Sequence, residues 1–143
     1  MYSEALEVQA LAETVVDQYG DSIQDVYGQP VRIKYLFKDS KKSQYLGKCS
    51  RATGKWAHLF ATDYVIEIWL QWWKDALPNA KKALLFHELK HIQLVEKEDE
   101  NGDIEISWKI RKHDAEMFVD DIALFGTWLP VHSEILEVCK ELS

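Results

Sequence analysis

Three residues in a short apolar stretch have the types and the spacing of a metal site. Residues 81–98, KKALLFHELKHIQLVEKE, contain His87, Glu88 and His91 in a His-Glu-x-x-His pattern. On a helix, residues four apart lie on the same face, so both imidazoles can converge on one zinc ion. Glu88 lies beside the first histidine and can act as a general base on a zinc-bound water. The pattern predicts two metal ligands and a catalytic base on one element.

The same residues also fit an ordinary amphipathic helix. In that interpretation His87 and His91 are satisfied in the core or at its boundary, and Glu88 is solvated. The neighbouring residues favour the metal, because they are strongly apolar: Ala83, Leu84, Leu85, Phe86, Leu94 and Val95. A buried imidazole without a partner is costly. A zinc ion would satisfy both rings, so we expect His87 and His91 to be ligands.

A third protein ligand is expected further along the chain. A catalytic zinc normally has three protein ligands and a water molecule. One extended metalloprotease pattern would need Gly at position 94 and His at position 97, where this chain has Leu94 and Lys97. The candidates are therefore His113 and Glu116, three apart at the start of a later helix. We favour His113, because imidazole is a strong zinc donor, with Glu116 as the alternative.

The remaining polar residues near these positions have supporting or structural interpretations. Three carboxylates could orient a ligand imidazole by accepting its second N–H group: Asp114, Glu116 and Asp120. His58 and His132 lie in no comparable pattern. We expect these two histidines to be structural.

The elements that would position the site follow an α+β order. Apolar residues recur at helical spacing over residues 3–19, and Gly20 is a plausible stop. Strands are predicted at residues 31–37, within 43–54, and at 64–70. Pro78 suits the first turn of a helix, and good helix formers continue for nearly five turns.

A hairpin should separate this helix from the region of the third ligand. Asn101-Gly102 is a strong turn signal, and apolar residues alternate after it from Ile104 to Ile110. Residues 113–126 and 133–142 then have helical spacing. We therefore predict an N-terminal helix, a small mainly antiparallel sheet, the His-Glu-x-x-His helix, a β-hairpin and a second metal-ligand helix. All belong to one domain, residues 1–143.

Composition excludes several classes of protein. The 143 residues are 47% hydrophobic with six Trp, which is enough for a real core. A net charge of −7 argues against a nucleic-acid partner. The acidic N-terminus is unlike a signal peptide, and no apolar run reaches the roughly 20 residues that cross a membrane. Cys49 and Cys139 are too few for a disulfide scaffold. A cytoplasmic location is expected.

Several separated blocks resemble the putative phage metallopeptidase family, whose members are small and encoded by phages or prophages. The blocks are RIKYLF, YLGKCSRATGKW, DYVIEI, ALLFHELKHI and KHDAEMF, in that order between residues 31 and 128. More distantly, a downstream histidine that opens a later helix resembles SprT-like zinc peptidases. The resemblance implies a minimal zincin-like fold and a zinc peptidase. It matches at His87, Glu88, His91 and His113.

The first functional hypothesis is a zinc-dependent metallopeptidase that acts on a protein or peptide in the cytoplasm of the host cell. Glu88 would be the general base on the zinc-bound water, and a strand within residues 64–70 could hold an extended substrate. The transition state also needs a group that stabilises the oxyanion. Four residues are candidates for it, although each also has a structural or surface interpretation: Tyr45, Lys48, Arg51 and Tyr64.

The second hypothesis is a non-catalytic module, stabilised by zinc, that binds a host or phage protein. The two hypotheses differ in the fourth position of the metal. An open position with a groove leading to it favours the enzyme. A site closed by four protein ligands, for example both His113 and Glu116, favours the structural role.

Overall fold

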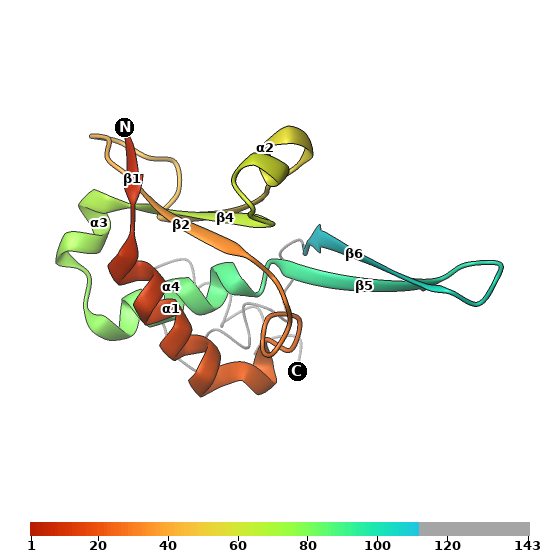
Figure 1. Ribbon diagram of the computed structural model, residues 1–143. Helices are drawn as coiled ribbons and strands as arrows, with labels where there is room; N and C mark the ends of the chain where they lie inside the picture. Colours follow the sequence, from red (N-terminus) through yellow and green to blue (C-terminus); the bar gives the residue numbers. More distant parts are fainter. Residues whose placement is uncertain (112–143) are drawn as a thin grey trace, which may run out of the picture.

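The computed structural model describes residues 1–111 of the chain. Its helices are α1 (Leu6–Tyr19), α2 (Gly54–Leu59), α3 (Leu70–Asp75) and α4 (Pro78–Leu89), with a short 3-10 turn, η1 (Gly20–Ser22). Its strands are β1 (Tyr2–Glu4), β2 (Ile33–Lys38), β3 (Gly47–Arg51), β4 (Tyr64–Trp69), β5 (Ile92–Glu98) and β6 (Ile104–Ile110). Helices α1 and α4 cover one face of a sheet, and α2 lies on its other side (Figure 1).

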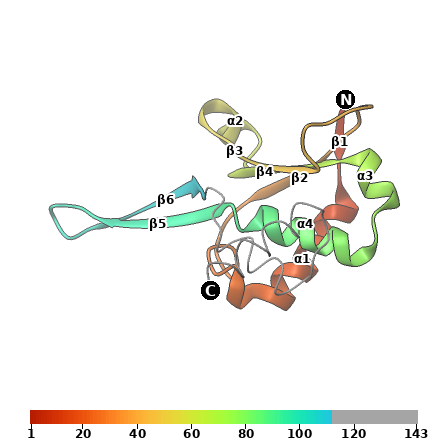
Figure 2. The same ribbon diagram turned by 180° about the vertical axis from the view of Figure 1, so that it is seen from behind.

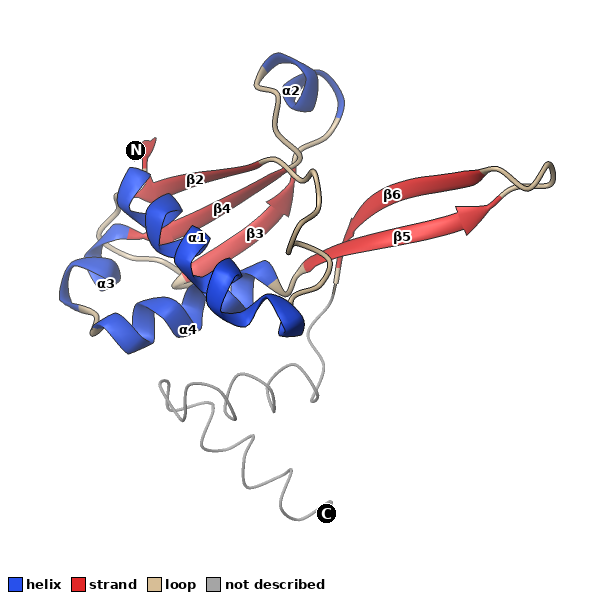
Figure 3. Cartoon of the chain, turned by 60° about the horizontal axis from the view of Figure 1, so that its bottom comes forward, coloured by secondary structure: helices blue, strands red, loops and turns tan. Residues whose placement is uncertain are grey.

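The larger sheet has the strand order β1-β2-β4-β3. Strands β1 and β2 pair antiparallel, β2 and β4 parallel, and β3 and β4 antiparallel. The sheet is therefore mixed, with two of its three pairings antiparallel, and the predicted α+β class is confirmed. Strand β4 lies between two neighbours, whereas β3 forms an edge. Figure 3 shows this sheet behind α1.

The core lies between this sheet and the two long helices. Strand β4 alternates between buried and half-buried residues, as expected when one face of a sheet packs on helices. Its fully buried side chains are Tyr64, Ile66 and Ile68. The helices contribute Val8, Ala12 and Val15 from α1, and Ala83, Leu84, Leu85, Phe86 and Leu89 from α4.

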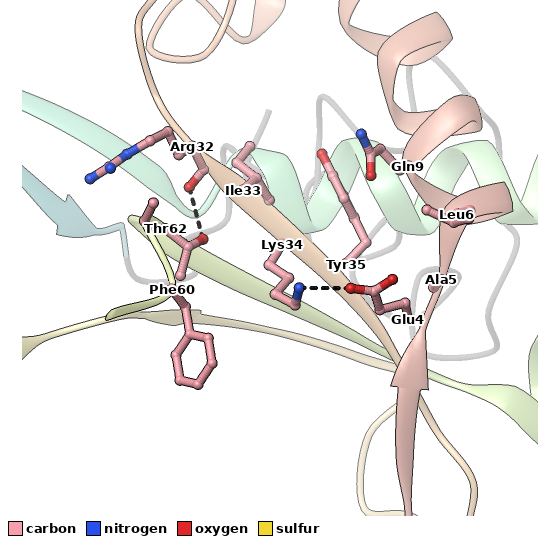
Figure 4. Close-up of a pocket in the computed structure, with 11 residues that line it drawn as sticks. Glu4, Ala5, Leu6, Gln9, Arg32, Ile33, Lys34, Tyr35, Phe60 and Thr62 are labelled. Carbon is pink, nitrogen blue, oxygen red and sulfur yellow. Dashed lines mark hydrogen bonds and ion pairs between the residues drawn. The ribbon is translucent and has the colours of Figure 1, made fainter. Parts of the chain in front are cut away.

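The N-terminal helix starts later than its sequence predicts. The expected start was residue 3, but Tyr2–Glu4 pair with β2 and helix α1 begins at Leu6. The Lys34 ammonium contacts the Glu4 carboxylate at 3.0 Å across these strands (Figure 4). A hollow of about 200 Å³ lies beside this pair. The strand pairing takes the first residues because β2 offers an open antiparallel edge.

The largest correction concerns the predicted helix of nearly five turns. Helix α4 begins at Pro78, as predicted, but ends at Leu89, and Ile92–Glu98 form strand β5. Strand β5 pairs with β6 over its whole length, from Ile92 opposite Ile110 to Glu98 opposite Ile104. Most residues of IQLVEKE are good helix formers, so the pairing with β6 overrides the local helix propensity. His91 therefore lies after the helix, in the turn that leads into β5.

The hairpin predicted from Asn101-Gly102 is present, and it projects away from the body (Figures 1 and 2). Its turn is tied by the Asp99 carboxylate, which accepts the N–H groups of Asn101 and Asp103 at 2.9 Å each. Gly102 has φ +83°, a conformation that glycine adopts without strain. The turn chemistry therefore matches the sequence signal.

The predicted strand at residues 64–70 ends one residue earlier, because Leu70 begins helix α3, and helix α2 and a turn precede the strand. The helices predicted at residues 113–126 and 133–142 lie outside the described residues. Within residues 1–111, no helix has the length and apolar character that crossing a membrane requires.

Candidate metal centre

The three residues of the His-Glu-x-x-His pattern form one buried cluster. One potential ligand atom from each of His87, Glu88 and His91 lies within 4.8 Å of the others. The two imidazole rings have centroids 5.2 Å apart and stand almost perpendicular, at 85°. The three residues are 8%, 4% and 8% exposed, respectively. Two imidazoles and a carboxylate that converge in a buried place are a donor set that fits zinc.

The end of helix α4 keeps the two histidines together although His91 lies outside it. The Lys90 N–H donates to the Phe86 carbonyl at 3.1 Å, and the His91 N–H donates to the Glu88 carbonyl at 3.1 Å. These bonds continue the helical path and tighten its last turn. The i, i+4 geometry predicted for a long helix is therefore produced by a helix terminus.

The ring of His91 is oriented by the main chain beyond β6. Its Nδ1 lies 2.6 Å from the Arg111 carbonyl oxygen. A carbonyl oxygen can only accept, so Nδ1 carries a hydrogen, and in the neutral ring the lone pair is on Nε2. The Arg111 N–H also donates to the His91 carbonyl at 2.6 Å. His91 and Arg111 thus continue the β5–β6 pairing by one step, and that step sets the tautomer.

The Glu88 side chain packs against the edge strand. An ideal β-carbon built on Gly47 would lie 3.3 Å from both Cγ and Oε1 of Glu88. The neighbouring Cys49 is affected too: burial, and secondarily the charge of Glu88, raise the pKa of its thiol far above the usual range. Glu88 therefore lies under β3, between this strand and helix α4.

Side-chain alternation divides the four candidates for the oxyanion role between the two faces of the sheet. Gly47 faces Glu88, so Arg51, four residues along β3, faces the same way, and Lys48 faces the opposite way. Tyr45 is also on the opposite face, where its hydroxyl donates to the Glu67 carboxylate at 2.7 Å and where this bond raises the pKa of Tyr45 to about 12. Tyr45 and Lys48 are thus directed away from the cluster.

Tyr64 lies on the inner face but its hydroxyl is already engaged. It donates to the Lys109 carbonyl at 2.6 Å, and burial raises its pKa to about 12. Its ring meets the Trp108 ring edge-on at 6.2 Å. Tyr64 therefore anchors the hairpin to the sheet.

Strand β4 cannot hold a substrate by main-chain pairing, contrary to the expectation for residues 64–70. Both of its edges are occupied, by β2 over Tyr64–Trp69 and by β3 over Tyr64–Ile68. The strand that ends the larger sheet beside helix α4 is β3. This correction follows from strand order, which the local sequence does not encode.

The other predicted residues fall outside the cluster. His58 lies in α2, on the far side of the sheet from α4 (Figure 1). The third-ligand candidates His113 and Glu116 lie outside the described residues, as do Asp114, Asp120, His132 and Cys139. The hollow of Figure 4, near Glu4 and Thr62, has no residue of the cluster in its lining.

Sequence reasoning missed three residues that contact the cluster or its neighbours. Gly47 gives Glu88 room, the Arg111 main chain holds His91, and Asp25 binds the Arg111 side chain at 2.7 Å. No local pattern marks them, because each contact joins segments that are distant in the chain. Block YLGKC did contain Gly47, but its spacing gives no sign of the contact with Glu88.

Comparison with known proteins gives one match. The model of a protein family described as putative phage metallopeptidase matches residues 1–142. No curated protein and no solved structure matches the chain.

Proposed function

Because the chain belongs to the putative phage metallopeptidase family, we propose that it is a zinc-dependent peptidase that hydrolyses peptide bonds of a protein target. The observation that carries this proposal is the buried convergence of His87, Glu88 and His91, with ligand atoms within 4.8 Å of one another. Two imidazoles and a carboxylate that converge in one place form a donor set that fits a zinc ion.

Zinc is the ion that this donor set fits best. His87 and His91 would be ligands, with His113 as the third ligand and Glu116 as its alternative. Imidazole nitrogen is a preferred zinc donor, whereas magnesium and calcium take oxygen ligands. When bound, the ion would polarise the scissile carbonyl and lower the pKa of a coordinated water molecule. The zincin-like arrangement is part of this proposal, and the helix end beside an edge strand supports it.

Glu88 would move the proton. Glu88 follows the first histidine in the chain, and the residue is 4% exposed. In that position it accepts a proton from the attacking water and delivers it to the departing amine. Gly47 and the end of α4 limit the side chain to a small space, which keeps its oxygens near the reacting atoms.

The edge strand β3 would hold the substrate. An extended peptide can add to an open strand edge through main-chain hydrogen bonds, and β3 (Gly47–Arg51) is the edge that lies beside α4. Arg51, on the inner face of this strand, would stabilise the oxyanion. Both assignments use the same strand, so substrate and catalytic groups would meet beneath β3.

The decisive experiment measures metal and cleavage in one pair of variants. We expect purified wild type to contain about one zinc per chain, and Glu88→Gln to keep the zinc and lose cleavage. The exposed Glu7→Gln is the matched control and should retain both. Metal analysis that finds no transition metal in the wild type would reject the proposal. Cleavage that survives in Glu88→Gln would reject the role of Glu88.

A zinc-stabilised interaction module is the second candidate, and the hairpin favours it. Ile104 and Ile106 on β6 are 66% and 59% exposed on an arm that projects from the body. Such residues are typical of surfaces that bind another protein. The test compares capture of host or phage proteins by wild type and by Glu88→Ala. Equal capture, together with a zinc ion closed by four protein ligands, would favour this module over the peptidase.

A further inference from the structure

An ion pair connects the loop after η1 to the end of the hairpin. Asp25 and Arg111 are 86 residues apart, and an Nη2 hydrogen of Arg111 donates to Asp25 Oδ2 at 2.7 Å. The same carboxylate oxygen accepts the Leu94 N–H of β5 at 3.1 Å. The side chains of Arg111 and Asp25 are 34% and 27% exposed, respectively. One carboxylate therefore contacts both strand β5 and the residue that directly follows β6.

Arg111 also contacts His91, a residue of the metal cluster, through its main chain. The Arg111 carbonyl accepts from Nδ1 of His91 at 2.6 Å, and its N–H donates to the His91 carbonyl at 2.6 Å. Asp25 thus holds the side chain of Arg111, and Arg111 holds the imidazole of His91 through its main chain. The carbonyl is the group that leaves the lone pair of the neutral ring on Nε2.

We propose that Asp25 and Arg111 are positioning residues of the metal site, with Asp25 fixing the Arg111 main chain so that the His91 ring presents Nε2 to the metal. This inference rests on the proposed function, because it assumes that His91 is a ligand. Groups that orient a ligand histidine contribute about 10- to 100-fold in metal affinity. Since Asp25 acts through one further residue, we expect an effect near the lower limit.

Zinc affinity of the full chain, measured by competition with a chromogenic chelator, tests the proposal. We expect Asp25→Ala and Arg111→Ala each to raise the zinc Kd about tenfold. Arg111→Ala keeps the carbonyl that contacts His91 and removes only its anchor. The matched control is Asp21→Ala, an exposed acid four residues before Asp25, which should leave the Kd unchanged.

The double variant separates one shared path from two independent effects. If Asp25 acts through Arg111, the combined Asp25→Ala and Arg111→Ala change weakens zinc binding no more than the larger single change. Arg111→Lys should recover part of the affinity, because it keeps a cation for Asp25. Additive losses, or a Kd that stays at the wild-type value in folded Asp25→Ala, would overturn the proposal.

A spectroscopic readout distinguishes positioning from a structural role. In the metal-free wild type, long-range ¹⁵N–¹H correlation should show His91 with hydrogen on Nδ1, and Asp25→Ala should mix the two tautomers. A role in stability alone would lower the melting temperature without this change. If Asp25→Ala does not fold, the same measurements are made on Asp25→Asn. The amide oxygen of this variant can still accept from the Leu94 N–H group, whereas the negative charge that binds Arg111 is removed. A wild type that binds no zinc instead rejects the proposed function itself.

Discussion

Gly47 and Glu88 are in contact across the boundary between the edge strand and the metal-site helix. A β-carbon at position 47 would lie 3.3 Å from the Glu88 carboxylate oxygen and 3.2 Å from Cδ1 of Leu84. These separations are tight but leave a flexible side chain able to shift by a few tenths of an ångström. The absence of a side chain at this position therefore sets where the proposed base lies.

Replacement of Gly47 should consequently affect catalysis more than metal binding. We expect Gly47→Ala to displace the Glu88 carboxylate and lower kcat about tenfold, because small misplacements of a reacting group are costly. Zinc content should not change. Gly47→Val should also destabilise the protein by about 1–3 kcal/mol through overpacking. Ser50→Ala, on the outer face of β3, is the control, and equal losses of kcat in both variants would contradict the contact.

Of the four candidates for the oxyanion role, Arg51 and Tyr64 lie on the inner face of the sheet. The Tyr64 hydroxyl already donates to the Lys109 carbonyl, so Arg51 is the candidate that we favour. We expect Arg51→Ala to lower kcat about 100-fold with zinc retained, the magnitude typical of losing one oxyanion donor. Arg51→Lys should recover part of the rate. Lys48→Ala, which removes a cation from the opposite face of β3, should have little effect. Similar kinetics in Arg51→Ala and wild type would refute the assignment.

Zinc should stabilise the folded protein by mass action. At free zinc 100 times above the Kd, the free energy of unfolding should rise by about 2.7 kcal/mol, since the ion binds the native state. His91→Ala should remove most of this gain. His58→Ala, a change on the far side of the sheet, should preserve it. Chemical denaturation with and without a chelator measures the difference in the free energy of unfolding. The same free energy of unfolding for the wild type under both conditions would contradict this prediction.

We expect ionisation of the Tyr64 hydroxyl to lower the stability of the folded protein at high pH. Burial raises its folded pKa to about 12, above an ordinary value of 10.0. The unfolded chain therefore loses this proton first, so the contribution is complete below pH 10 and declines as pH rises toward 12. Tyr64→Phe should flatten this decline, measured as urea midpoint against pH. It should also cost about 1 kcal/mol at neutral pH, because the Lys109 carbonyl loses its donor.

The control for this prediction is Tyr27→Phe. Tyr27 is 51% exposed, so removal of its hydroxyl should leave the alkaline decline as in the wild type. An unchanged decline in Tyr64→Phe would show that Tyr64 does not titrate in this range.

Local sequence determined several elements because their signals act over a few residues. Pro78 begins α4 since its ring suits the first turn of a helix. Gly20 follows the last residue of α1, and Asn101-Gly102 makes the hairpin turn. The His-Glu-x-x-His spacing also brought the two imidazoles together, because the backbone keeps its helical path to Lys90 even after the helix has ended.

Tertiary pairing decided the rest. Residues 92–98 consist mostly of good helix formers, and they are a strand because β6 lies opposite them. Which strands end the larger sheet depends on the order β1-β2-β4-β3, and that order depends on contacts between distant segments. The same is true of Asp25, Arg111 and Gly47. The sequence placed the ligands along the chain, whereas the pairing of remote segments oriented His91 and set the space for Glu88.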